Sequence, residues 1–223
     1  MAHVTPSDEL TRDPRALWDA EAETFDDEPH HSLEDPLLRS LWWDVLEPVV
    51  PAPPVLVADL GCGTGSLSVL MAERGHSVIG VDVSPVMLAR AREKAARAGV
   101  DVVFVVGDAA APPVVAIDVV VTRHVVWALD DIPAALDTWF SLLTPGGRLV
   151  LVEGRWHTGA GIEAEDLAAL VRRPGVEVEI TELDDPALWG HPLTDSRYVL
   201  VARTDGGADT MDGLPQPRGP RQS

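Results

Sequence analysis

Apolar positions in the middle of the chain come in short continuous runs, separated by segments with helical spacing. Runs of this length, rich in valine, leucine and isoleucine, are typical of strands buried on both faces of a parallel sheet. Five such runs occur, at residues 55–60, 77–82, 101–109, 116–122 and 148–154. After the first run, Leu67, Leu70 and Met71 recur at helical spacing. The alternation predicts an α/β fold with a mostly parallel sheet.

The N-terminal segment has a different pattern. Helical spacing predicts helices over 14–25 and 36–46, and the proline-rich stretch 48–54 reads as a linker into the first strand. We therefore expect residues 1–54 to form a helical lid and linker beside the α/β domain.

The region after the fifth run predicts three more elements. Residues 163–172 have the spacing of a short helix, 176–183 alternate as a half-exposed strand, and 197–203 form a last strand. The α/β domain is thus expected to span 55–203. The polar tail 204–223 has almost no apolar residues and is expected to be disordered.

The connection between the third and fourth strands is unusually short. Residues 109–116 offer too few positions for a crossover helix, which needs roughly ten or more residues together with its loops. We expect an irregular loop there, and a thinner helical layer on that face of the sheet.

Charge and composition exclude several classes of partner. The net charge of −19 opposes binding to nucleic acid and to anionic membranes. The cluster Arg90, Arg92, Lys94 and Arg97 lies around one predicted helix and is interpreted as its solvated face. A single cysteine, Cys62, rules out an internal disulfide. Without a signal peptide or an apolar run of about 18 residues, the protein is expected to be soluble and cytoplasmic.

The turn after the first strand carries the most specific motif. Asp59 ends the apolar run, and Gly61, Gly63 and Gly65 follow at alternating positions before a helix. A dinucleotide fingerprint would place its third glycine at position 66, which is Ser66. The Asp59 carboxylate would also repel a pyrophosphate at the helix N-terminus. The motif therefore favours a ligand with a positive charge and no phosphate.

Acidic residues also end the next two strands. Asp82 closes the second strand, where a carboxylate can accept hydrogen bonds from ribose hydroxyls, and Asp108 closes the third. Ser84 and Pro85 then provide the cap and first residue of a helix. In this order and spacing the motifs resemble those of the class I S-adenosylmethionine-dependent methyltransferases, in particular the type 11 small-molecule group.

The resemblance implies a fold, a cofactor and a set of site residues. The fold is a Rossmann-like, seven-stranded, mostly parallel sheet with an antiparallel last strand, in a three-layer sandwich with an N-terminal helical lid. The cofactor is S-adenosyl-L-methionine, and no metal is needed. The expected cofactor-binding residues are Trp18, Phe25, Asp59, Gly61, Gly63, Gly65, Asp82, Val83, Met87, Asp108, Ala109 and Arg123.

Arg123 and His124 follow the fourth strand, above the expected position of the methyl group. His124 is a candidate base or acceptor-orienting group, with Arg123 beside it, but a structural histidine that closes the pocket is an equal alternative. Trp127 is expected as a pocket wall, and Trp156 and His157 are expected to line the acceptor pocket from the opposite side.

Two features of the lid leave alternatives open. His30 and His31, with the neighbouring acids, could bind a metal, but a solvated loop is the preferred interpretation. Adjacent Trp42 and Trp43 cannot share one helix face, so one of them should face the pocket or solvent.

The predicted function is methyl transfer to an oxygen, nitrogen or carbon atom of a small, apolar or aromatic acceptor, in a monomer or homodimer. Two alternatives remain. One is an enzyme that uses the cofactor site for other chemistry, and the other is a non-catalytic binding module that retains the site.

Overall fold

The computed structural model describes residues 13–206, whose strands form one seven-stranded sheet of order β3-β2-β1-β4-β5-β7-β6. The strands are β1 Leu56–Leu60, β2 Ser77–Asp82, β3 Val103–Val106, β4 Ile117–Arg123, β5 Leu143–Arg155, β6 Val176–Glu182 and β7 Ser196–Thr204. The first five are parallel, and β7 runs antiparallel between β5 and β6. The predicted sheet is confirmed.

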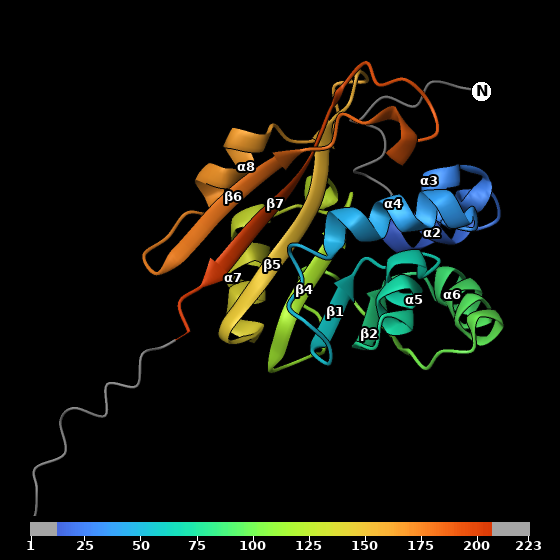
Figure 1. Ribbon diagram of the computed structural model, residues 1–223, viewed down its shortest axis with the longest axis horizontal. Coiled ribbons are helices and arrows are strands. Elements are labelled where there is room, and N and C mark those ends of the chain that lie inside the picture. The colour runs from blue at the N-terminus through green and yellow to red at the C-terminus, as the bar shows by residue number, and fades with distance from the viewer. Residues whose placement is uncertain (1–12, 207–223) are drawn as a thin grey trace, which may run out of the picture.

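Helices cover both faces of the sheet in the three layers expected (Figure 1). The helices are α2 Pro14–Glu21, α3 Pro29–Ser32, α4 Pro36–Leu46, α5 Ser66–Glu73, α6 Pro85–Ala98, α7 Ile132–Leu142 and α8 Ala164–Val171. Short 3₁₀ turns lie at η1 Phe25–Asp27, η2 Val126–Ala128 and η3 Pro186–Leu188. Helices α4, α5 and α6 lie on one side, and α7 and α8 on the other.

Local sequence signals explain where several helices begin. A proline occupies the first turn, preceded by a side chain that accepts a hydrogen bond from an amide of that turn. The capping residues are Asp13 for α2, Asp35 for α4, Ser84 for α6 and Asp131 for α7.

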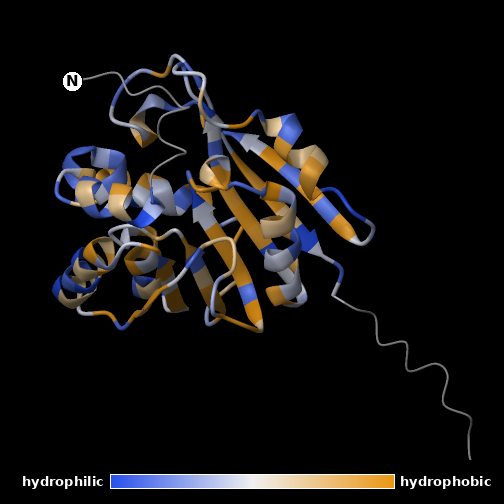
Figure 2. Cartoon of the chain, turned by 180° about the vertical axis from the view of Figure 1, so that it is seen from behind, coloured by the Kyte–Doolittle hydropathy of each residue, from blue (hydrophilic) through white to orange (hydrophobic). Residues whose placement is uncertain are grey.

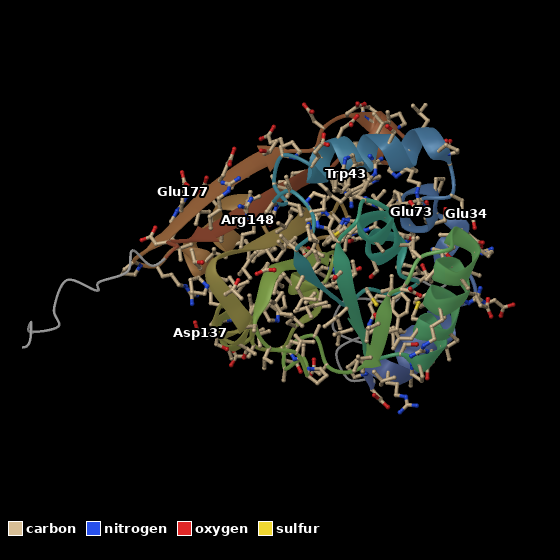
Figure 3. All side chains as sticks on the ribbon, turned by 60° about the horizontal axis from the view of Figure 1, so that its bottom comes forward. Glu34, Trp43, Glu73, Asp137, Arg148 and Glu177 are labelled. Atoms are coloured by element: carbon tan, nitrogen blue, oxygen red, sulfur yellow. The ribbon has the colours of Figure 1, made fainter. Side chains whose placement is uncertain are left out.

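The apolar strands separate two cores (Figure 2). On the α4 and α5 side, Trp42 and Leu46 are fully buried against strand valines. On the α7 and α8 side, Leu136 and Trp139 are fully buried. Trp43, labelled in Figure 3, is also buried, 8% exposed. The Arg74 guanidinium lies 4.7 Å from its ring centroid. The expectation that one of the adjacent tryptophans faces the pocket or solvent is therefore wrong.

The short connection between β3 and β4 has the predicted irregular form. Residues 107–116 contain no helix, and they leave Val103 and Val115 exposed on this part of the molecule. The layer that covers this end of the sheet is thinner, as expected.

Three predicted elements differ from the structure by more than two residues at an end. The first N-terminal helix ends at Glu21 rather than at residue 25, β3 spans Val103–Val106 rather than 101–109, and β5 begins at Leu143 rather than at 148. Thr204, expected in the tail, belongs to β7. The remaining expectations for residues 1–12 of the lid and 207–223 of the tail lie outside the described residues. Within residues 13–206, no helix has the length and apolarity required to cross a membrane.

Candidate cofactor and acceptor site

A cavity of about 940 Å³ lies at the carboxyl ends of the parallel strands. It opens beside β1 and β4, where the order of the strands reverses direction, the usual ligand site of an open α/β sheet. Eleven of the twelve predicted cofactor residues line it: Trp18, Phe25, Asp59, Gly61, Gly63, Asp82, Val83, Met87, Asp108, Ala109 and Arg123. The sequence thus predicts where the cavity forms.

The glycine turn after β1 brings backbone to the cavity wall. Gly61 and Gly63 have φ angles of 67° and 53°, which non-glycine residues adopt with strain. A Cβ atom on Gly61 would lie 2.5 Å from the Val125 side chain. The turn is held to β2, because the amides of Gly61 and Cys62 both donate to the Val81 carbonyl.

Gly65 differs from the other two glycines because it does not border the cavity. It starts α5 with a φ of 76°, and a Cβ atom there would lie 2.8 Å from Ala91 and 3.1 Å from the Phe104 ring. The structure therefore does not bring Gly65 to the cavity wall with the other predicted residues; Gly65 permits close packing of α5 against α6 and β3.

Asp59 lies at the base of the cavity and is 2% exposed. Its Oδ2 atom accepts a 2.5 Å hydrogen bond from Ser68 Oγ. Burial raises the pKa of Asp59 to about 6, while the Ser68 hydrogen bond and the positive charge of Arg123 act in the opposite direction. A cationic group in the cavity would stabilise the ionised form.

Asp82 connects the tip of β2 to two neighbouring turns. Oδ2 accepts from the Gly63 amide and Oδ1 from the Ser84 amide, both at 2.8 Å. Burial raises the pKa of Asp82, whereas the two amides favour its ionised form. Each carboxylate oxygen keeps a lone pair available for a ligand.

The wall beyond β2 and β3 mixes apolar and acidic groups. Met87 is buried and Val83 half-buried, and both border the cavity. Asp108 is exposed, and its Oδ1 accepts from the Ala110 amide at 2.8 Å. Asp108 therefore caps its own turn, with its other oxygen available at the cavity rim.

The N-terminal segment covers the cavity. Trp18 and Phe25 both line it, with ring centroids 6.3 Å apart in an edge-on arrangement. Asp19 accepts a 2.6 Å hydrogen bond from Ser84 Oγ, which fixes α2 to the start of α6. The described part of the predicted lid thus contacts the domain through specific hydrogen bonds.

Arg123 binds the lid rather than pointing freely into the cavity. Its guanidinium donates to the His30 carbonyl at 2.6 Å and lies 4.9 Å from the Trp42 ring centroid. Burial lowers the pKa of Arg123 to about 10, with Asp59 counteracting the shift, so the side chain stays charged.

His124 sits on an unusual backbone conformation at the cavity wall. Its φ is 60°, and its carbonyl accepts from Trp127 Nε1 at 2.9 Å. The ring stacks on Trp189 at 5.7 Å and meets Trp156 edge-on at 5.2 Å. Nε2 is buried with no hydrogen-bond partner among the described residues. Burial, followed by the charge of Arg123, lowers the pKa of His124 well below its ordinary value, so the imidazole is neutral at pH 7.

The histidine pair of the lid is not a solvated loop. His30 is 7% exposed and packs edge-on against Trp189, while His31 stacks on Phe25 at a centroid distance of 4.3 Å. Both line the cavity, and burial lowers their pKa values to about 3 and 4. Within residues 13–206, no three His, Cys, Asp or Glu side chains are grouped to hold a metal ion.

The far wall contains predicted and unpredicted residues. Trp127 and Trp156 border the cavity as expected, with ring centroids 5.5 Å apart. His157, expected beside Trp156, is exposed and does not border it. Arg197 was not predicted; it pairs with Asp195 at 3.0 Å and lies over the ring of Trp189. Further lining residues that the sequence does not predict include Glu21, Leu67, Asp130, Asp131 and Thr138. Three of them, Asp130, Asp131 and Thr138, lie just before α7 or within it, and the helix-start signal Asp131-Ile-Pro marks the start of that helix in the sequence.

Comparisons with known proteins agree with this geometry. Residues 57–147 match the family model of a methyltransferase domain. Over 104 residues the chain is 40% identical to a demethylmenaquinone methyltransferase of Thermus thermophilus, covering 45% of this chain and 47% of the relative. The chain thus spans about half the length of that protein.

Solved structures of similar fold include the N-methyltransferase NodS of Bradyrhizobium japonicum in complex with S-adenosyl-L-homocysteine. It is 19% identical with a TM-score of 0.67, over 85% of this chain and 97% of that one. The [4+2]-cyclase SpnF is 24% identical with a TM-score of 0.65, over 76% and 81%. The sheet order and the ligand cavity agree with the matched methyltransferase domain, and the chain has the fold of the class I S-adenosylmethionine-dependent methyltransferases.

Proposed function

We propose that this chain transfers the methyl group of S-adenosylmethionine to a small-molecule acceptor within the cavity. The observation that carries the proposal is the pairing of the glycine turn with two buried carboxylates, Asp59 and Asp82, at the cavity wall. Such a wall suits a ligand with hydroxyls and positive charge, and it disfavours a pyrophosphate.

The residues present fit this cofactor. The volume of about 940 Å³ is near the upper end of the roughly 300–1,000 Å³ of ligand pockets, which leaves room for a cofactor and an acceptor. The two lone pairs left on the Asp82 carboxylate can accept from ribose hydroxyls. Asp59 can face the ammonium of the amino-acid part. Asp108, Ala109 and Met87 form the wall proposed for the adenine.

When bound, the cofactor supplies a methyl group on a positively charged sulfur, from which a nucleophile can displace it. The chain's part is to align the acceptor and to exclude water, and such alignment alone accounts for large rate effects. Lid residues Trp18 and Phe25 cover the cavity and reduce access of water.

His124 is proposed to orient the acceptor or remove its proton. Its neutral imidazole can accept a proton at pH 7, which a charged one could not. The alternative role, closing the pocket, rests on its packing between Trp189 and Trp156.

The acceptor is proposed to be small and apolar or aromatic. Trp127, Trp156 and Leu129 give the far side of the cavity an apolar surface on which a flat ring can stack. The proposal extends to an acceptor atom of any of the three kinds, oxygen, nitrogen or carbon.

Binding and turnover test the proposal separately. Calorimetry with S-adenosylhomocysteine should show one site, and NADH should not compete at millimolar concentration. Incubation with radiolabelled S-adenosylmethionine and a metabolite extract should then label a small molecule. Absence of binding would reject the cofactor site. Binding without methyl transfer to any fraction would favour other chemistry or a binding module.

A further inference from the structure

Lys94 is a buried cation, although the sequence pattern groups it with Arg90, Arg92 and Arg97 on a solvated helix face. It is 6% exposed, whereas Arg92 and Arg97 on the same helix α6 are exposed. Lysine is rarely buried unless it is paired, because removing an ammonium from water is costly. The interpretation of the whole cluster as solvated is therefore wrong at Lys94.

The partners of Lys94 come from two segments that border the cavity. From the lid, both carboxylate oxygens of Asp26 lie 3.1 to 3.2 Å from Nζ, and the Ser32 carbonyl lies at 3.4 Å. From the glycine turn, Thr64 Oγ1 lies at 3.0 Å and Ser66 Oγ at 2.7 Å.

These partners also bind one another. Thr64 Oγ1 donates to Asp26 at 2.7 Å, and Ser66 Oγ donates to the carbonyl oxygens of His31 and Ser32. The ammonium thus completes a network in which every polar group has a partner from the opposite segment. Burial lowers the pKa of Lys94, and the facing Asp26 carboxylate counteracts the shift.

The network lies directly behind residues of the cavity wall. Phe25 precedes Asp26 and His31 precedes Ser32, and both line the cavity. Gly63 precedes Thr64, lines the cavity, and donates to Asp82. Displacing either segment would move the surface on which the proposed cofactor rests.

We propose that Lys94 is a positioning residue that holds lid residues 25–32 closed against the glycine turn, so that cofactor affinity depends on it. The inference rests on the proposed function, because it requires the cofactor to bind in this cavity. Lys94 itself does not line the cavity and acts through Phe25, His31 and Gly63.

The test compares Lys94→Met with Arg97→Met. Arg97 lies one turn further along α6 and also faces an acidic residue of the N-terminal segment, Glu34, which is labelled in Figure 3. This pair is 3.6 Å apart, and both side chains are about two-thirds exposed. Exposed pairs of this kind contribute little, so Arg97→Met should change S-adenosylhomocysteine affinity less than about twofold. Lys94→Met should weaken it at least about tenfold by calorimetry.

Two further measurements separate positioning from a general loss of stability. Asp26→Asn removes the charge of the carboxylate that pairs with Lys94 and should also weaken S-adenosylhomocysteine binding. The double variant Lys94→Met/Asp26→Asn should bind about as weakly as Lys94→Met alone, because both changes break the same network. Hydrogen exchange should become faster in residues 25–32 of Lys94→Met while β4 and β5 keep their protection.

The outcomes distinguish the inference from the proposed function. If wild-type protein does not bind S-adenosylhomocysteine, the proposed function fails. If wild type binds and Lys94→Met binds equally well, or if its exchange rises uniformly over the chain, the positioning role is overturned.

Discussion

The backbone amide of Gly63 donates a 2.8 Å hydrogen bond to Oδ2 of Asp82. One side chain at the tip of β2 therefore fixes the glycine turn that follows β1, 19 residues earlier in the chain. The same carboxylate borders the cavity, so the group proposed to hold the ribose also shapes the turn beside it.

Asp82→Asn should lower both cofactor affinity and stability. An asparagine amide group would face a backbone N–H of Gly63 or Ser84 and lose one of the two hydrogen bonds. We expect S-adenosylhomocysteine binding to weaken by about 2–4 kcal/mol and the free energy of unfolding to fall by about 1–3 kcal/mol. Calorimetry and urea titration measure the two effects. The exposed Asp101, replaced in the same way, serves as the control, and equal affinity in both variants would remove the ribose assignment.

Gly65→Ala should destabilise the chain more than Gly99→Ala. Both glycines have similar φ angles, 76° and 68°, so both variants pay a similar backbone cost of about 1 kcal/mol. At Gly99 a Cβ atom meets nothing within 4 Å, whereas at Gly65 it meets Ala91 at 2.8 Å. Overpacking should add about 1–3 kcal/mol at Gly65. Equal midpoints of urea unfolding for the two variants would contradict a packing role.

The sequence predicted the sheet and the cavity wall because both depend on local signals. Apolar runs define the parallel strands, and the residues after each run must meet at one edge of the sheet. Asp59, Asp82 and Asp108 therefore reach the cavity even though they are distant in sequence. The irregular 109–116 connection follows from its length alone.

The sequence did not predict that the lid buries the side chains of Lys94 and His30. Lys94 and His30 look exposed in their own segments, because a helix and a turn-rich stretch with these compositions are usually solvated. They become buried only when residues 25–32 fold against α6 and β4, a contact between segments more than 60 residues apart. Periodicity along the chain carries no information about such contacts.

Glu153→Gln should change the pH dependence of stability. Glu153 is fully buried, and its Oε1 accepts from the amides of Val125 and Val126 at 2.8 and 2.7 Å, directly after His124. Burial raises its pKa from 4.5 to about 8, against the effect of the two amides. The folded chain therefore holds a proton that the unfolded chain releases above pH 4.5.

Because the folded chain binds this proton more tightly than the unfolded chain, protonation of Glu153 stabilises the fold. The stabilisation is complete below pH 4.5 and is lost as the pH rises to about 8. Over that window Glu153 should lower the wild-type free energy of unfolding by up to about 1.4 kcal/mol per pH unit, a contribution that Glu153→Gln lacks. Urea titrations at several pH values measure the difference. Glu177→Gln, on the exposed face of β6 (Figure 3), should follow the wild-type curve. A curve for Glu153→Gln that is parallel to wild type would show that this carboxyl titrates alike in both states.

His124→Asn tests whether the imidazole takes part in the reaction. Asparagine tolerates the φ of 60° at this position and lacks the ring nitrogen, so the backbone turn should persist. If His124 takes a proton from the acceptor, kcat should fall by about 10²–10⁴-fold with cofactor affinity nearly unchanged. His157→Asn, at an exposed histidine outside the cavity wall, should retain wild-type kcat.

The lowered pKa of His124 sets the expected pH profile. Protonation would stop a histidine base, and burial moves that protonation well below the ordinary value of 6.5, so its acid limb should be absent between about pH 6 and 9. Any limb within that range should persist in His124→Asn, because it arises from the acceptor or another group. A variant with wild-type kcat but weaker S-adenosylhomocysteine binding would identify His124 as a pocket-closing residue. The deciding measurements are kcat and cofactor affinity of wild type and His124→Asn across this pH range. Loss of a base lowers kcat, whereas loss of a wall residue weakens cofactor binding.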